Sequence, residues 1–101
     1  MAPKLEYRVL SEDEVTRALA ALSGWSVVDG KLHKEFRFAG FGEAIGFMVA
    51  VAVSAERLDH HPEWSNVYAT VVVDLITHAV DGLSPYDLAL AERMDGLAGR
   101  S

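Results

Sequence analysis

The sequence predicts an α+β fold with a four-stranded antiparallel sheet, three helices packed on one of its faces, and the element order α-β-β-α-β-β-α. Apolar residues recur at helical spacing in three segments, and extended stretches around short turns lie between them. The chain has 101 residues, of which 50% are hydrophobic, enough for one core. We therefore expect a single domain over residues 11–101. Residues 1–10 lack periodicity, and we expect them to form a mobile N-terminal extension.

The first helix is predicted over residues 12–22. Ser11 and Glu14 have the spacing of a capping box, in which the serine caps the helix and the glutamate reaches back to it. Gly24 can end the helix. The apolar residues of this segment follow helical spacing: Val15, Ala18, Leu19 and Leu22.

Residues 25–28 and 31–38 are predicted to form a β-hairpin. They flank Asp29-Gly30, a pair that favours a two-residue turn because glycine tolerates positive φ. Alternation in the second strand places Leu32, Phe36 and Phe38 on one face. His33 falls on the opposite face, and we expect it to point to solvent.

The second helix is predicted to begin at Phe41 and to end at Pro62, because the residue before a proline avoids the helical region. Phe47 and Val51 lie off the main apolar stripe, so the helix is apolar on more than one side. We expect one face to pack on the sheet and another on a second copy, giving a homo-oligomer. The main stripe contains Phe41, Ile45, Met48, Ala52, Ala55 and Leu58.

Residues 64–78 are predicted to form a second hairpin that turns near Ala69-Thr70, because the stretch is long for one strand. Its inward face holds Val71, Val73, Leu75 and Thr77, and His78 ends the strand. Ser84 as N-cap, Pro85 at the first position and Asp87 at the third begin the last helix. Its buried stripe is predicted to contain Tyr86, Leu90, Met94 and Leu97.

The charge and cysteine content exclude several classes of function. The chain carries 15 acidic and 9 basic residues, a formal charge of −6, which disfavours binding to nucleic acid or to an anionic membrane. The apolar run over residues 44–53 is about half the ~20 residues that a membrane-spanning helix needs. There is no cysteine, and the first residues lack the apolar run of a signal peptide, so we expect a cytoplasmic protein.

Three of the four histidines, His60, His61 and His78, lie close together in the sequence with carboxylates around them. Histidine can both give and take protons near neutral pH. Glu56 lies one helical turn before His60, so we expect it to orient that imidazole and raise its pKa. His60 and His61 would leave the helix about 100° apart and line two walls of a pocket. Asp87 lies at the positive end of the last helix, which favours its ionised form.

Structural roles could also account for these residues. The histidine pair could simply complement the C-terminus of a helix, His78 could be an ordinary strand-end residue, and Asp87 could serve only in a capping box. Trp64 and Tyr68 suit the core or a pocket wall better than catalysis. A zinc site would use three histidines and a carboxylate, but the one-turn histidine pair of H-E-x-x-H is missing, so no metal is expected.

The pattern Glu56-x3-His60-His61-Pro62-x5-Tyr68-x9-His78-x8-Asp87 resembles the signature of the pterin-4a-carbinolamine dehydratases. The likeness covers residues 11–98 and includes further motifs in the same order: Gly24-Trp25, Phe41-x5-Phe47-Met48, Glu56-Arg57-Leu58-Asp59, Glu63-Trp64, Asn66-Val67-Tyr68, Thr77-His78 and Gly82-Leu83-Ser84. This resemblance implies the same fold, a dimer or tetramer, and a pterin dehydratase domain over residues 11–101.

The resemblance also implies a reaction. It is the loss of water from 4a-hydroxytetrahydropterin (4a-hydroxytetrahydrobiopterin), which gives quinonoid dihydropterin and recycles the pterin after an aromatic amino acid hydroxylase has used it. No cofactor or metal is implied. The positions that match the family signature imply that His60 and His78 are the acid–base pair, in either order, and that His61 holds the pterin. The implied substrate-binding residues are Glu56, Asp59, Pro62, Trp64, Asp87 and Trp25.

The chain departs from the family pattern at Tyr86, where members commonly carry a basic residue, and at Ala69, where a turn-forming residue is usual. The first change could alter substrate affinity or pterin preference. A non-catalytic role is the alternative function, because animal members also serve as dimerisation cofactors of a homeodomain transcription factor. The apolar second helix could support such a role.

Overall fold

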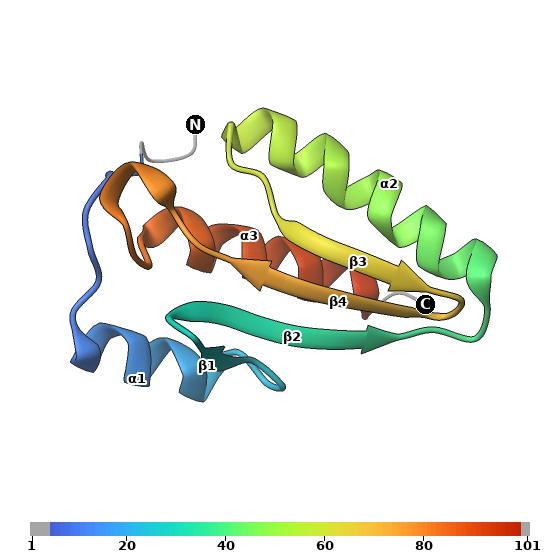
Figure 1. Ribbon diagram of the computed structural model, residues 1–101, viewed down its shortest axis with the longest axis horizontal. Coiled ribbons are helices and arrows are strands. Elements are labelled where there is room, and N and C mark those ends of the chain that lie inside the picture. The colour runs from blue at the N-terminus through green and yellow to red at the C-terminus, as the bar shows by residue number, and fades with distance from the viewer. Residues whose placement is uncertain (1–4, 100–101) are drawn as a thin grey trace.

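The computed structural model describes residues 5–99, and its elements follow the predicted order (Figure 1). Both hairpins and all three helices are present, so the predicted fold class is confirmed. A short 3-10 helix, η1, was not predicted, and it places His78 just after the last strand rather than within it. The elements are α1 (Glu12–Ala21), β1 (Ser26–Val28), β2 (Lys31–Arg37), α2 (Phe41–Leu58), β3 (Glu63–Val67), β4 (Thr70–Leu75), η1 (His78–Val80) and α3 (Pro85–Ala98).

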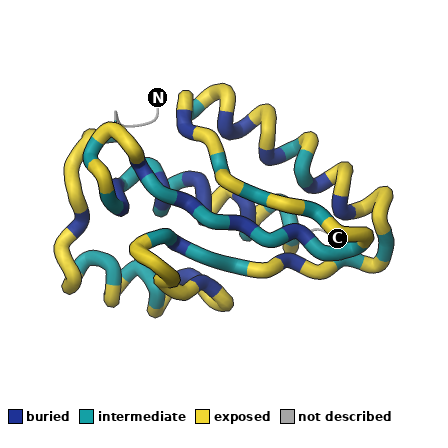
Figure 2. The backbone as a smooth tube through the Cα atoms, viewed as in Figure 1, coloured by how far each residue is buried: buried dark blue, intermediate teal, exposed yellow. Residues whose placement is uncertain are grey.

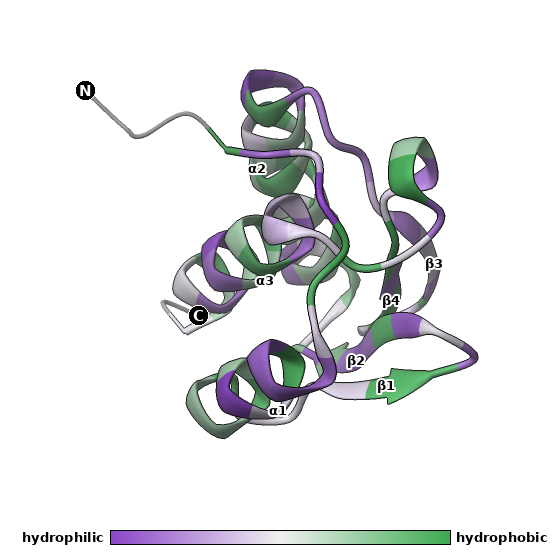
Figure 3. Cartoon of the chain, turned by 90° about the vertical axis from the view of Figure 1, so that its left-hand side faces the viewer, coloured by the Kyte–Doolittle hydropathy of each residue, from purple (hydrophilic) through white to green (hydrophobic). Residues whose placement is uncertain are grey.

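The four strands form one antiparallel sheet in the order β1-β2-β4-β3, with all three helices on the same side of it (Figure 3). The hairpin between β3 and β4 turns at Tyr68-Ala69, one residue earlier than predicted. Tyr68 takes the left-handed conformation there, with φ of 51°. This hairpin points away from the end of the sheet where β3 begins, so Tyr68 lies a full strand length from Glu63.

The core lies between the sheet and the helices, centred on β4 and α3. Buried and half-buried residues alternate along β4 (Figure 2), and the predicted inward face of that strand is confirmed. On α3, Leu90 and Met94 are fully buried as predicted, while Tyr86 and Leu97 are only half-buried. Ala91 and Asp87 take the other buried positions of this helix.

The second helix packs one face on the sheet, as predicted, and this is the face that holds Phe47 and Val51 rather than most of the main apolar stripe. Its buried residues are Ala44, Phe47, Val51, Ser54 and Ala55. Phe41 and Ile45, which belong to the main apolar stripe, are 52% and 36% exposed. A helix that is apolar all round gives no sequence signal for which face meets the sheet, so only packing decides.

The predicted end of α2 is also corrected: the helix stops at Leu58, before Pro62 can act. Asp59 takes the left-handed conformation, with φ of 51° and ψ of 43°. The Asp59 amide donates to the Glu56 carbonyl, and the His60 amide donates to the Ala55 carbonyl. These two bonds form a Schellman motif, which closes the helix and redirects the chain at the histidines.

Residues 5–10 form neither helix nor strand, yet they pack on the domain; the rest of the predicted extension lies outside the described residues. Leu10 is 7% exposed, and its amide donates to the Leu83 carbonyl at 2.8 Å. Tyr7 stacks on Tyr86 of α3, with ring centroids 4.4 Å apart. Over residues 5–99, none of the helices has the length and hydropathy required to span a membrane.

Candidate active site

His60 is buried beside the first turn of α3. It is 7% exposed, and its Nε2 lies 2.6 Å from Oδ1 of Asp87, 27 residues further along the chain. The left-handed turn at Asp59 aims the imidazole away from α2 and toward α3. The other ring nitrogen, Nδ1, has no hydrogen-bond partner among residues 5–99. A carboxylate held against one nitrogen fixes the tautomer and leaves the second nitrogen to exchange a proton.

Asp87 is the centre of a buried hydrogen-bond network. Its Oδ2 accepts from the Thr77 hydroxyl at 2.7 Å and from the Ser84 amide at 3.0 Å. The Thr77 and Ser84 hydroxyl oxygens lie 2.7 Å apart. The side-chain oxygens of Asp87, Thr77 and Ser84 are therefore all hydrogen-bonded. The predicted capping box is therefore present, and the same carboxylate also holds His60.

His61 pairs with the carboxylate that the sequence assigned to His60. Its Nε2 lies 3.0 Å from Oε1 of Glu56, and both side chains are exposed. The expectation that Glu56 would orient His60 is wrong in this structure, because the helical spacing on which it depended ends at Leu58. Because Asp59 is left-handed, His61 rather than His60 lies next to Glu56 on the last turn of α2.

His78 lies on the solvent side, at the start of η1. Its Nε2 is 3.2 Å from Oε2 of Glu63, and its side chain is 76% exposed. Lys31 bonds the other oxygen of Glu63. The hydrogen bond from Lys31, followed by the one from His78, lowers the pKa of Glu63 below its ordinary value. The fourth histidine, His33, pairs with Asp74 at 2.9 Å on the outer face of the sheet.

Each histidine of the predicted cluster therefore has its own carboxylate, and only His60 is buried. The remaining candidates are placed in three different ways. Asp59 is exposed and shapes the turn, Pro62 is half-buried between α2 and β3, and Trp64 packs against the core from β3, opposite Val73. No group of three or more histidine, aspartate or glutamate side chains in residues 5–99 could hold a metal ion.

Trp25 lies in a separate polar cluster. Its indole Nε1 is 3.0 Å from both carboxylate oxygens of Asp95, and the Lys34 ammonium lies 2.8 Å from the same carboxylate. Asp95 is eight residues, about two helical turns, beyond Asp87 on α3. The structure thus places Trp25 by the far half of α3 and does not bring it to the histidines.

Tyr86 occupies a position beside His60, with ring centroids 5.8 Å apart. Its hydroxyl donates to the Leu5 carbonyl at 3.3 Å, and its hydrogen bond with Tyr7 raises the pKa of Tyr7 above the ordinary value. The residue that departs from the family pattern therefore ties the N-terminal segment to the site. Tyr7 carried no sequence signal, because it lies in a segment without periodicity.

Thr77 and Ser84 are contacts of Asp87 that the sequence reading did not place in the site. Ser84 caps α3 as predicted. Thr77 is buried on the inward side as predicted, but it lies two residues beyond the end of β4, in an isolated bridge with Gly82, and not within the strand. One signal in the sequence could have indicated that both contact Asp87. It is a threonine that follows a buried strand, seven residues before a serine-aspartate helix cap. Glu63, the partner of His78, was noted only as part of a family motif.

Known proteins of one family resemble this chain in sequence over most of its length. The family model described as pterin 4 alpha carbinolamine dehydratase matches residues 8–97. The chain belongs to the pterin-4a-carbinolamine dehydratase family. A relative from Solibacter usitatus that carries the family's name is 51% identical over 89 residues, covering 88% of this chain and 94% of that protein. Another from Jannaschia sp. is 53% identical over 92 residues, covering 85% and 94%.

A solved structure also agrees with the family assignment. The crystal structure of the transcriptional coactivator/pterin dehydratase from Brucella melitensis matches with a TM-score of 0.88 and 45% sequence identity. The match covers 91% of this chain and all of that one. The sequence resemblance to the dehydratase family is thus confirmed in sequence and in fold.

Proposed function

We propose that this chain is a 4a-hydroxytetrahydropterin dehydratase, a hydro-lyase that uses histidine acid–base catalysis. The observation that carries the proposal is the buried His60–Asp87 pair, with the Nδ1 atom of His60 left without a partner among the described residues. A buried ionisable pair gains little net stability over apolar residues of similar size, which favours a catalytic role for this one. Membership of the dehydratase family supplies the substrate class.

The reaction breaks the C4a–O bond and forms a double bond to C4a. A general acid gives a proton to the leaving hydroxyl, which departs as water, and a general base takes the proton from a ring N–H, so the charges balance. We assign these roles to His60 and His78, in either order, and substrate holding to His61. Glu56, Asp59, Pro62, Trp64 and Asp87 complete the proposed site. No cofactor is needed.

Loss of either proton-transfer group should reduce turnover by about 10²–10⁴-fold. The test is the rate of 4a-hydroxytetrahydropterin dehydration, followed by ultraviolet absorbance, for wild type, His60→Ala and His78→Ala. His33→Ala is the matched control, because His33 also pairs with a carboxylate but lies outside the proposed site. Wild-type rates in both site variants, or equal loss in the control, would refute the assignment. Circular dichroism checks that each variant is folded.

A homo-oligomer is part of the proposal. The face of α2 that points away from the core carries exposed apolar side chains: Phe41, Ile45, Val49 and Val53. Their exposed fractions range from 36% to 60%, a continuous apolar stripe at helical spacing on one domain. A second copy would cover this stripe in a dimer or tetramer, and light scattering of wild type beside Val49→Glu would test it. The catalytic reaction is proposed for the cytoplasm.

The same stripe favours one alternative, a non-catalytic binding module that acts through α2. The Brucella melitensis protein is described as both a coactivator and a dehydratase. A folded wild type that does not accelerate dehydration, yet binds a heterologous protein in a manner lost in Val49→Glu, would support this alternative.

A further inference from the structure

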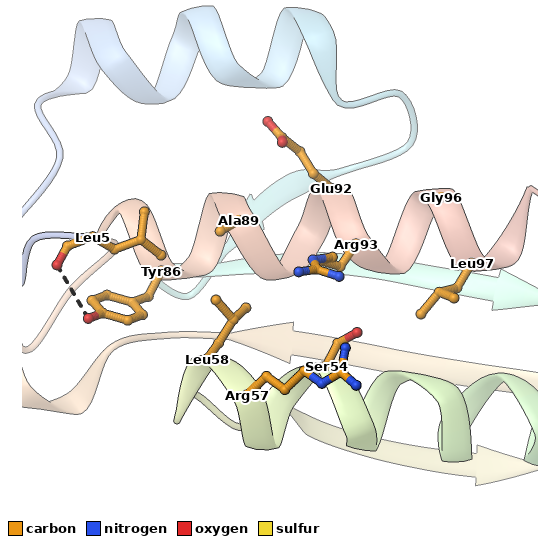
Figure 4. Close-up of a pocket in the computed structure, with 10 residues that line it drawn as sticks. All are labelled: Leu5, Ser54, Arg57, Leu58, Tyr86, Ala89, Glu92, Arg93, Gly96 and Leu97. Carbon is orange, nitrogen blue, oxygen red and sulfur yellow. Dashed lines mark hydrogen bonds between the residues drawn. The ribbon is translucent and has the colours of Figure 1, made fainter. Parts of the chain in front are cut away.

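We propose that the groove between α2 and α3 is a second ligand site, which binds a small organic anion with an apolar body. The groove has a volume of about 830 Å³, in the range of small-molecule sites (Figure 4). Its lining comes from α2, α3 and the N-terminal segment, and includes Arg57, Arg93 and Ser54.

The net charge of the side chains that line the groove is positive, whereas the net charge of the whole chain is negative. The formal charge is −6, so carboxylates are abundant. Arg8, Lys31, Lys34 and Arg37 each have a carboxylate partner within 4 Å.

By contrast, neither Arg57 nor Arg93 has an ion-pair partner among residues 5–99. In Figure 4 the Arg57 side chain runs along α2 toward Ser54, and Arg93 lies at the edge of α3 that faces α2. Glu92 also lines the groove, but its carboxylate points to the other side of α3 (Figure 4). Two arginines and one glutamate line the groove, a net charge of +1, and two guanidinium groups without ion-pair partners on neighbouring helices favour a bound anion.

The remaining walls define the rest of the ligand. Leu58 and Leu97 face the groove from the two helices, and Leu5 closes one end. Ser54 lies one turn before Arg57 on the same side of α2, so its hydroxyl can add a hydrogen bond to the anion. On α3, a Cβ added at Gly96 would meet nothing within 4 Å, which indicates open space beside Arg93. The ligand is therefore an oxyanion, a carboxylate or a phosphate monoester, attached to a hydrophobic group.

This site is distinct from the histidines and from the apolar stripe of α2. His60, His61 and His78 do not line the groove, and neither do Phe41, Ile45, Val49 and Val53. Tyr86 is the one shared element, since it lines the groove and lies beside His60. The proposal therefore does not depend on dehydratase activity.

The test is a titration of ¹⁵N-labelled protein with phenyl phosphate and, separately, with benzoate, followed by amide chemical shifts. Saturable shifts are expected for Arg57, Arg93 and Gly96 with at least one of the two, which also identifies the preferred oxyanion. Benzyl alcohol, which has the ring without the charge, and inorganic phosphate, which has the charge without the ring, should bind at least about tenfold more weakly.

The double variant R57Q/R93Q should weaken binding of the preferred anion by about tenfold or more. R17Q is the matched control, because Arg17 is an exposed arginine on α1 that also lacks an ion-pair partner in residues 5–99, outside the groove. Unchanged affinity in R57Q/R93Q, equal loss in R17Q, equal binding of benzyl alcohol, or shifts confined to the apolar stripe of α2 would each overturn the proposal.

Discussion

The buried network around Asp87 and the exposed pairs of His61 and His78 use the same two kinds of side chain in opposite surroundings. Asp87 is 0% exposed and contacts three other groups, whereas the side chain of Glu56 is 79% exposed and contacts His61 alone. Water can replace the partner of an exposed group, but it cannot reach a buried one. The comparison separates side chains that hold the fold and orient His60 from those that are free to meet a substrate.

The largest effect on stability is expected at the centre of the buried network. One carboxylate oxygen of Asp87 contacts His60 and the other accepts from Thr77 and from the Ser84 amide. Asp87→Asn turns one of these oxygens into an NH₂ donor, so buried groups lose their acceptor, which should cost about 3 kcal/mol. Urea denaturation measures the change in the free energy of unfolding. Glu56→Gln is the matched control, because it breaks a histidine pair at the surface, and it should cost less than about 1 kcal/mol. Similar losses in the two variants would contradict the distinction between the regions.

A smaller effect is expected when one hydrogen bond leaves the network. Thr77→Val keeps the β-branched shape but removes the hydroxyl that donates to Asp87, which should cost about 1–3 kcal/mol. Thr70→Val, a threonine on the outer face of β4 and outside the network, should change stability by no more than about 0.5 kcal/mol. Equal unfolding midpoints for the two variants in urea would show that the network contributes nothing through Thr77.

The smallest change in stability is expected for the exposed Glu63, which pairs with Lys31 and His78, and it depends on pH. Lys31 and His78 lower the pKa of Glu63 below its ordinary value of 4.5. A carboxyl group with a depressed folded pKa adds stability above its unfolded pKa, and this contribution is lost as the pH falls through the folded value. The melting temperature of wild type should therefore exceed that of Glu63→Gln at pH 7, and the difference should shrink below about pH 4.5.

Glu92→Gln is the control for this experiment, because Glu92 has no ion-pair partner in the described residues. It should show no such pH dependence. A difference between wild type and Glu63→Gln that grows on acidification would mean that the pair with Lys31 does not stabilise the folded state. Added salt should reduce the difference at pH 7, since exposed pairs are screened.

Local signals in the sequence were sufficient to predict the three α-helices and the four strands, though not η1. The capping boxes that begin at Ser11 and Ser84, the Asp29-Gly30 turn and the alternation of β4 all act within a few residues. Each depends on the chain's own backbone geometry, so each could be predicted and is found. The histidine-rich segment and its family resemblance were likewise readable from the sequence.

Packing alone decided which of these residues meet. His60 reaches Asp87 across 27 residues because one left-handed residue, Asp59, ends α2 early, a choice that helical spacing does not encode. Trp25 lies with Asp95 rather than with the histidines, and α2 buries Phe47 while exposing Phe41. The sequence by itself determined the three α-helices, the four strands, their order and the chemical types at the site. Only the tertiary structure decided their partners, because contacts between distant segments depend on how whole faces pack.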